Sequence, residues 1–241
     1  DINPTVPDKI FDTTVTGIAE STFENMTFIE KITLPETCTY IDSYAFKGCK
    51  YLDTINAPGV TTVRIESFIN CTLLDYVNLP KLKTLSRGCF RNCGELNNLP
   101  VDNFTLIPQY AFAYCSFSNV FFPNVTDVYG HAFSGCRSMI EISLPSLVDG
   151  CLGESVFSNC NMLEKVNFPE DFVSLAGFTF SSCNMTNFDF LKNIQYVYWG
   201  DFSWCQYVEI MPLPSVVFVD TRTFDYMPSL KEIIIPSCTT V

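Results

Sequence analysis

Twelve cysteines, one histidine and 26 acidic residues are the side chains of this 241-residue chain that could carry out chemistry. Zinc sites use cysteine and histidine ligands in closely spaced pairs such as C-x-x-C. The sequence has no such pair, and His131 has no cysteine pair beside it. The hydrolase motifs G-x-S-x-G and H-E-x-x-H are also missing from the sequence. We therefore expect no metal site, no cofactor, no catalytic residue and no enzymatic activity.

The cysteines instead follow a regular spacing. Ten phenylalanines recur at intervals of 21 to 24 residues, and in eight cases Cys stands three residues after Phe. The two terminal copies, at Phe23 and Phe224, carry Met26 and Met227 in place of Cys. Such self-similarity indicates a repeat protein. The eight complete F-x-x-C units comprise Phe46 and Cys49, Phe68 and Cys71, Phe90 and Cys93, Phe112 and Cys115, Phe133 and Cys136, Phe157 and Cys160, Phe180 and Cys183, and Phe202 and Cys205.

Other positions keep the same phase. An aliphatic residue stands five residues before each Phe, and Pro follows about twelve residues after most of them. Between Cys and Pro runs a pattern such as Leu52-x-x-Ile55-x-Ala57. Its alternation predicts a short strand, which Pro ends because it has no N–H group. The A-F-x-x-C segment is expected to close each coil as a tight helical turn, and stacked coils bury Phe and Cys in columns.

The eight cysteines of these units are expected to form a reduced ladder in the core. A buried free cysteine behaves as a small hydrophobe, and the phase gives Cys115 only apolar neighbours. Disulfides between neighbouring coils remain an alternative, since stacked strands lie about 4.8 Å apart, within the Cα range of a disulfide. Cys151 follows a small insertion at residues 148–150 and is the thiol that we expect to react.

These columns resemble the BspA-like leucine-rich repeats, whose unit reads roughly I-G-x-x-A-F-x-x-C-x-x-L-x-x-I-x-L-P. Residues 41–58 read IDSYAFKGCKYLDTINAP, and the resemblance covers about residues 18–238. The Gly after the aliphatic position is mostly replaced, by Asp42 or Arg64 for example, although Gly153 keeps it. The resemblance implies a β-rich solenoid of about ten coils of 21 to 24 residues, with parallel strands on one face and short helical turns on the other.

The repeat pattern also predicts the domain organisation. Residues 18–241 are expected to form one leucine-rich repeat domain, and residues 1–17 a partial repeat or cap. An eleventh repeat should begin after Pro236, so we expect it to be truncated.

Composition excludes several classes of partner. With 47% hydrophobic and 17% charged residues, the chain is too apolar to be disordered. Its formal net charge of −12 argues against nucleic acid and against an anionic membrane surface. No apolar run of about 18 residues is present, so we expect no membrane insertion.

The family resemblance implies a secreted or cell-surface protein that adheres to host matrix proteins or to other cells. Strand residues beside the buried aliphatic position should face solvent, and aromatic side chains among amides suit recognition of a protein or a glycan. The same pattern extends over Asn187 and Asp189. An ordinary solvated surface, a spacer for another domain and an intracellular interaction scaffold remain alternatives. The predicted ligand-binding residues are Tyr76, Asn78, Asn98, Asn119, Phe121, Glu141, Lys165 and Asn167.

Overall fold

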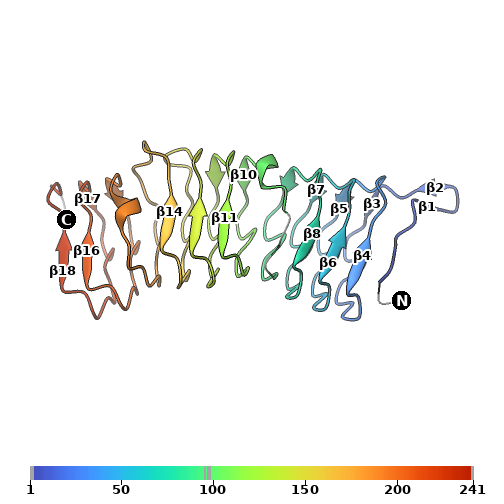
Figure 1. Cartoon of the computed structure of the whole chain (residues 1–241), viewed down its shortest axis with the longest axis horizontal. Helices are drawn as coiled ribbons and strands as arrows, with labels where there is room; N and C mark the ends of the chain where they lie inside the picture. Colours follow the sequence, from blue (N-terminus) through green and yellow to red (C-terminus); the bar gives the residue numbers. More distant parts are fainter. Residues whose placement is uncertain (1–2, 95, 97–98, 240–241) are drawn as a thin grey trace. The chain divides into compact units, whose positions relative to one another are not determined.

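The computed structural model describes residues 3–94, 96 and 99–239. Two compact units are present. Unit 1 comprises Asp1–Phe104 and Pro108–Phe117, and unit 2 comprises Thr105–Ile107 and Ser118–Val241. Each unit is built of stacked coils with parallel strands, so the predicted solenoid class is confirmed (Figure 1). The prediction of one domain over residues 18–241 stays a prediction.

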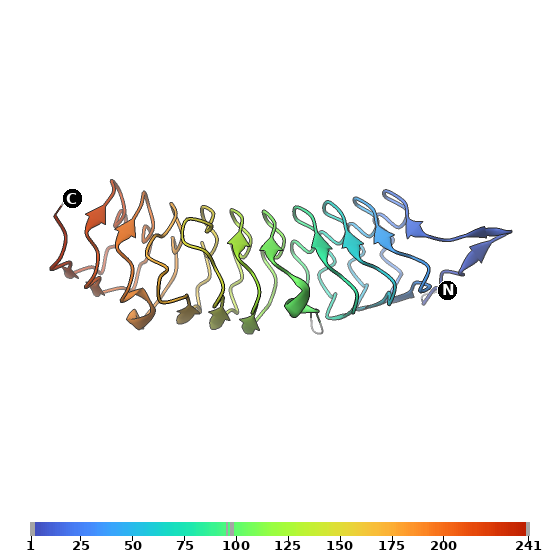
Figure 2. The ribbon, with the colours of Figure 1, turned by 90° about the horizontal axis from the view of Figure 1, so that it is seen from above.

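Unit 1 contains two parallel sheets, whose strands lie side by side in Figure 2. Neighbouring strands pair one repeat apart, so that Ile32 lies beside Ile55 and Ile55 beside Val77. A short antiparallel hairpin, β1 (Lys9–Ile10) and β2 (Thr13–Thr14), precedes them. The first sheet consists of β4 (Lys31–Thr33), β6 (Thr54–Asn56) and β8 (Tyr76–Asn78), and the second of β3 (Gly17–Ile18), β5 (Tyr40–Ile41), β7 (Thr62–Val63) and β9 (Thr84–Leu85).

Unit 2 repeats this arrangement in four smaller sheets. The described residues contain two helices, both 3-10: η1 (Val101–Asn103) in unit 1 and η2 (Asp189–Leu191) in unit 2. The strands of the four sheets are β11 (Asn119–Phe121), β13 (Glu141–Ser143) and β14 (Lys165–Asn167); β16 (Ile210–Pro212) and β18 (Glu232–Ile234); β10 (Leu106–Ile107) and β12 (Asp127–Val128); and β15 (Tyr196–Val197) and β17 (Phe218–Val219).

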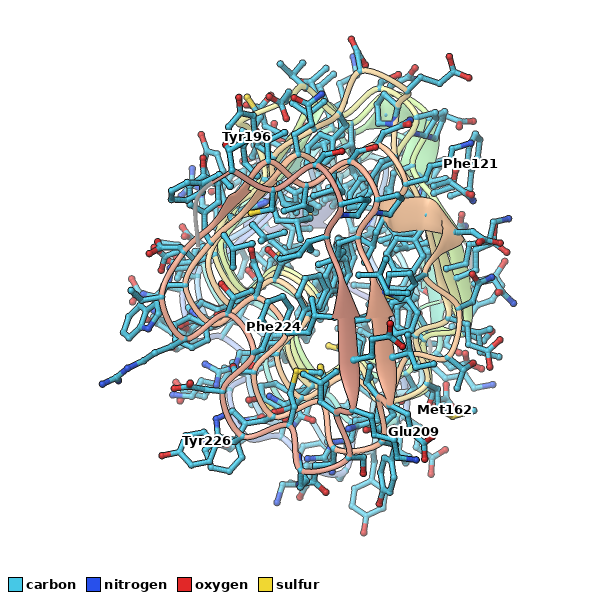
Figure 3. The ribbon with its side chains drawn as sticks, turned by 90° about the vertical axis from the view of Figure 1, so that its left-hand side faces the viewer. Phe121, Met162, Tyr196, Glu209, Phe224 and Tyr226 are labelled. Atoms are coloured by element: carbon cyan, nitrogen blue, oxygen red, sulfur yellow. The ribbon has the colours of Figure 1, made fainter. Side chains whose placement is uncertain are left out.

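Stacked phenylalanine rings fill the core of each unit. The Phe46 and Phe68 rings of unit 1 are parallel to within 1°, and their centroids lie 5.1 Å apart. The Phe157 and Phe180 rings of unit 2 stack at 5.7 Å. Figure 3 shows Phe224 pointing into the coil. Aromatic rings supply much of the buried apolar surface, and each ring can be covered only by the next repeat.

The segment around each Phe is a series of hydrogen-bonded turns and not a helix. In every repeat the residues two before and two after the Phe have positive φ, as at Tyr44 and Gly48 on either side of Phe46. Left-handed residues interrupt a right-handed helix. The backbone turns outward to the next repeat, where Phe46 N–H donates to Ser67 O over 2.8 Å.

The ladder cysteines are buried, but their neighbours are not only apolar. Cys71 Sγ donates to the carbonyl oxygen of Phe46, one repeat earlier, over 3.0 Å. Cys115 Sγ donates in the same way to Phe90 O over 3.0 Å. The expectation of a purely apolar site for Cys115 is therefore wrong, because the turn leaves a carbonyl beside each thiol. Burial raises the pKa of Cys205 to about 12, so this thiol stays protonated.

The sequence also overrates the reactivity of Cys151. Its side chain is half-buried and hydrogen-bonds with the Asp127 carboxylate. That bond, together with desolvation and the charges of Asp127 and Asp149, raises the pKa of Cys151. Because the thiolate is the reactive form, these carboxylates oppose the reactivity that we expected.

The thiol hydrogen bond predicts an order of stability for two variants. Cys71→Ala should lower the free energy of unfolding by about 1 kcal/mol or more, because it removes the bond to Phe46 O and leaves a small void. Cys71→Ser keeps a donor and should be at least as stable as Cys71→Ala. Urea unfolding measures both, with exposed Thr72→Ala as the control. A serine variant less stable than the alanine variant would show that the bond contributes nothing.

One carboxyl group is buried in unit 2. Asp201 Oδ1 accepts a hydrogen bond from Thr179 N–H over 3.0 Å, and Oδ2 accepts one from Tyr198 N–H over 2.6 Å. Burial raises the pKa of Asp201 from 3.8 to about 7, although these bonds oppose the shift. The folded state therefore holds a proton that the unfolded chain releases above pH 3.8.

This shift predicts a pH-dependent stability. The contribution of Asp201 to the free energy of unfolding is fully present below pH 3.8 and is lost as the pH rises through about 7. Asp201→Thr is a suitable comparison, because Thr179 and Thr223 occupy the same buried position in the neighbouring repeats. Between these pH values the free energy of unfolding of the wild type should fall by on the order of 3 kcal/mol relative to that of the variant. Denaturant unfolding at several pH values tests this, and parallel curves for the two proteins would contradict it.

Candidate functional site

The sheet formed by β11, β13 and β14 in unit 2 carries five of the predicted binding residues. Its central side chains, such as Ile142 and Val166, are buried, and the residues beside them therefore point outward. The parallel register places Asn119, Glu141 and Lys165 in one row across the strands. Phe121, Ser143 and Asn167 form a second row.

Glu141 organises the polar part of this face. Its Oε1 accepts hydrogen bonds from Lys165 Nζ over 2.9 Å and from Asn167 Nδ2 over 2.6 Å. The bond from Lys165 is the largest influence on the pKa of Glu141 and lowers it, and the bond from Asn167 lowers it further. The carboxylate therefore stays ionised at neutral pH and holds two donor side chains in fixed positions.

A hollow of about 320 Å³ opens beside these groups. The Phe121 ring borders it, is 55% exposed and projects outward from the coil (Figure 3). An exposed aromatic ring next to an ion pair can contact both an apolar and a polar group of a ligand. The lining residues are Asn119, Val120, Phe121, Glu141, Ser143 and Asn167.

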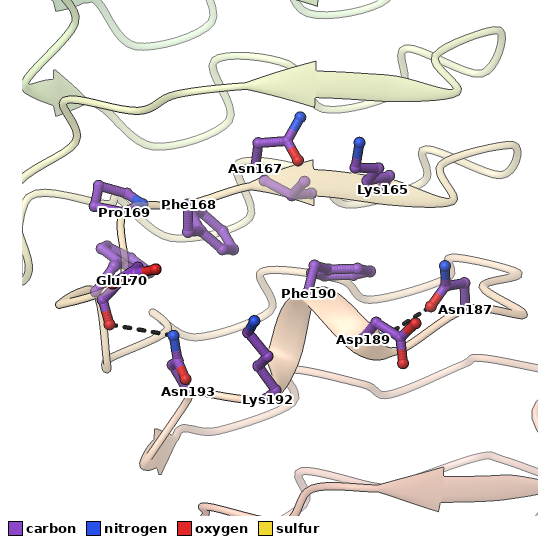
Figure 4. A pocket seen from close by; sticks show the side chains of 12 residues that line it. Lys165, Asn167, Phe168, Pro169, Glu170, Asn187, Asp189, Phe190, Lys192 and Asn193 are labelled. Carbon is purple, nitrogen blue, oxygen red and sulfur yellow. Dashed lines mark hydrogen bonds between the residues drawn. The ribbon is translucent and has the colours of Figure 1, made fainter.

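A second hollow, of about 400 Å³, lies between β14 and η2 (Figure 4). Phe168 and Phe190 border it. The Asn193 side chain, which donates to Glu170 O over 3.2 Å, lies on one side of it. Asp189 N–H donates to Asn187 Oδ1 over 2.9 Å, which fixes the asparagine in place.

The second hollow exists because one repeat departs from the strand pattern. The strand predicted over Asn187 and Asp189 is wrong, since η2 occupies its place. Phe188 stands where other repeats have Val166 or Met211 in the core, and its ring is only partly buried. Leu191 is fully buried in this repeat. We attribute the change to the size of the Phe188 ring, which is too large for a position built for a smaller chain.

Two other predicted binding residues belong to unit 1. Tyr76 and Asn78 lie on β8 in unit 1. The Tyr76 side chain is exposed, and Asn78 Nδ2 donates to Asn56 Oδ1 over 2.6 Å. Asn98 lies outside the described residues. The structure therefore brings together Asn119, Phe121, Glu141, Lys165 and Asn167, and the binding role of all eight stays a prediction.

Sequence reasoning missed two exposed aromatic residues. Trp204 and Tyr226 stack with their ring centroids 4.1 Å apart, on the turns of unit 2. Both have positive φ, at the position where most other repeats carry Asn or Gly. Large side chains are rare in this conformation, so their replacement of Asn or Gly was a signal that the sequence offered. Phe168 and Phe190 were also missed, and the signal there was Lys192 in the Pro column.

Among the residues that the structure describes, no group of three or more His, Cys, Asp or Glu side chains could hold a metal ion. His131 is half-buried and sits in a turn with a φ of 60°. Within the same described part of the chain, no helix is both long enough and apolar enough to cross a membrane.

Comparison with known proteins identifies the repeat. The model of the BspA type leucine-rich repeat region, which has six copies, matches residues 16–140 and 126–241. A search of curated proteins finds no match to this chain.

Solved structures share the architecture at low sequence identity. A leucine-rich repeat protein of T. pallidum is 22% identical with a TM-score of 0.52, and the alignment covers 75% of each chain. A leucine-rich cell surface protein of Faecalibacterium prausnitzii is 19% identical with a TM-score of 0.49, over 98% of this chain and 88% of that one. A leucine-rich repeat protein of Bacteroides ovatus is 18% identical with a TM-score of 0.46, over 99% and 82%. Since the family model covers nearly the whole sequence, the chain belongs to the BspA type leucine-rich repeat family.

Proposed function

We propose that this protein is a non-enzymatic binding module that recognises a protein partner through the sheet face of unit 2. Leucine-rich repeat proteins generally bind proteins, and this chain is a repeat module of that kind. The observation that carries the proposal is the arrangement of Phe121 beside the fixed Glu141, Lys165 and Asn167 side chains. Exposed aromatic anchors bordered by polar groups are typical of protein interfaces.

The geometry of the face favours binding without a large entropic cost. Glu141 already holds Lys165 and Asn167 in place, so little side-chain freedom remains to be lost when a partner docks. The face lies on paired strands, and the pairing between the strands fixes their positions. The carboxylate nearest to Phe121 on this face, that of Glu141, is already bound to Lys165 and Asn167, which supports a binding role over a catalytic one.

The cellular setting of the proposal comes from the family. Membership supports a secreted or cell-surface protein that adheres to host matrix proteins or to other cells. A glycan is the second candidate ligand, favoured by Asn119 beside the Phe121 ring. The twelve cysteines form no disulfide with one another, which instead favours an intracellular scaffold, since the cytosol keeps thiols reduced.

A pull-down with a matched pair of variants tests the binding face. Phe121→Ala should weaken capture of a host mucosal or serum protein by ~10-fold or more, because it removes the aromatic anchor. Tyr129→Ala is the control, since Tyr129 is 50% exposed and Phe121 is 55% exposed. Dissociation constants for the purified partner give the readout. A partner held equally by wild type and Phe121→Ala would refute the site, and capture of no partner would favour a spacer role.

The net charge of −12 predicts that the partner is basic. A basic partner should associate at a rate that falls several-fold as the ionic strength rises above ~0.1 M, because salt screens the attraction. Stopped-flow or surface measurements of the association rate check this. A rate independent of salt would show that the charge plays no part in recognition.

A further inference from the structure

β14 is an edge strand in the middle of unit 2. On one side it pairs with β13, where Val166 lies opposite Ile142. On its other side no strand of the described residues pairs with it, because the next repeat supplies η2 in place of a strand. β16, two repeats on, pairs only with β18 within that described part. A strand edge without a pairing strand is a template for strand addition.

The unpaired backbone groups of β14 can be named from the regular repeats. Between β13 and β14, Glu164 N–H donates to Ile140 O and Leu144 N–H donates to Asn167 O, both over 2.9 Å. One repeat later, the equivalent groups are Glu164 C=O and Phe168 N–H. Neither has a hydrogen-bond partner among the described residues.

Val166 completes the set of unpaired groups. Successive residues of a strand direct their backbone groups to opposite sides, so Val166 N–H and C=O point away from β13. Glu164, Val166 and Phe168 therefore present acceptor, donor, acceptor and donor along one line. Unpaired backbone groups of this order match those of an extended peptide.

The larger hollow of the candidate site lies along this edge. Its wall includes Val166 from β14 and Phe168, which directly follows β14, and Phe190 faces them from η2 (Figure 4). Two aromatic rings can hold one apolar side chain of a ligand. Two lysines, Lys165 and Lys192, balance the two acidic lining residues, so the hollow sets no strong demand for ligand charge.

We propose that the β14 edge binds an extended peptide segment of a partner protein, which adds to the sheet as a strand in the place left by η2. The inference rests on the proposed function and names its partner class and mode of binding. Main-chain hydrogen bonds to Glu164, Val166 and Phe168 give the affinity, and an apolar side chain between Phe168 and Phe190 gives selectivity.

The peptide is favoured over a glycan by what remains unpaired at the site. Asn167 and Asn193 already donate to Glu141 and to Glu170 O. Asn187 Oδ1 already accepts from Asp189 N–H. A sugar would find its usual amide partners engaged, whereas a strand would find the backbone groups of β14 unpaired.

A variant that restores the missing strand tests the proposal. Phe188→Val returns a small side chain to the core position. Lys192→Pro restores the Pro column, removes the N–H that donates to Asp189 O, and disfavours the helical conformation of Leu191. Proline fits there, since φ of Lys192 is −57°. In the double variant Phe188→Val/Lys192→Pro, the chain's own strand should pair with β14 in the place of η2. Lys192→Ala is the control that removes the lysine side chain but keeps its backbone N–H.

The probe is a phage-displayed library of random seven-residue peptides, selected on the wild type and then synthesised. The selected peptide should bind the double variant at least ~10-fold more weakly than it binds either the wild type or Lys192→Ala. In the wild type without peptide, the amide hydrogens of Val166 and Phe168 should exchange rapidly. Bound peptide should slow their exchange at least ~10-fold. Leu144, already paired, should not change.

Several outcomes would overturn the inference. These are failure to select any peptide, equal binding to the double variant, or bound peptide that leaves Val166 and Phe168 unprotected. If the double variant does not unfold cooperatively, exchange at these two amides in the wild type decides alone. A partner lost on Phe121→Ala but retained by the double variant would refute strand addition and leave the proposed function standing. A partner that binds Phe121→Ala and the double variant as tightly as the wild type would refute both strand addition and the proposed binding face.

Discussion

Each repeat of this protein completes its backbone hydrogen bonds and covers its phenylalanine ring only against the next repeat. Phe46 shows this constraint fully: its ring stacks on Phe68 at 5.1 Å, its N–H donates to Ser67 O, and its carbonyl accepts the Cys71 thiol. All three interactions join positions about one repeat apart. A residue that changes type or phase therefore loses partners in two neighbouring coils, which explains why the Phe and Cys columns are so regular.

The turns that hold these columns depend on left-handed backbone. Residues with positive φ stand on both sides of each Phe, and successive N–H groups there point in alternate directions. Some of these N–H groups close a turn, and the others donate to the next coil. Asn and Gly suit this conformation, and four repeats have Asn two residues after the Phe. Trp204 and Tyr226 occupy the same position at a conformational cost, which their mutual stacking at 4.1 Å offsets in part.

The same constraint leaves groups available for binding where a repeat lacks its strand. A regular coil leaves no strand edge open, because its neighbour pairs with it. The repeat containing Phe188 breaks that rule and leaves the β14 edge beside a hollow of about 400 Å³. Immediately next to it, Glu141 fixes Lys165 and Asn167 on the regular part of the sheet. An ordered face and an unpaired edge thus adjoin each other in unit 2, and both properties favour recognition of another chain.

The sequence alone determined the repeat, its phase and the strand positions that face outward, because a period of about 22 residues must place equivalent residues at equivalent points of a coil. It therefore predicted eight binding residues on the strand face, of which Asn119, Phe121, Glu141, Lys165 and Asn167 share one sheet. Only the tertiary structure decided three other features. The thiols donate to carbonyls of the preceding repeat, Asp201 is buried within the turns, and Phe188 lies outside the core. Each of these depends on the space and the polar groups that a neighbouring coil provides, and a pattern read along one chain does not contain that information.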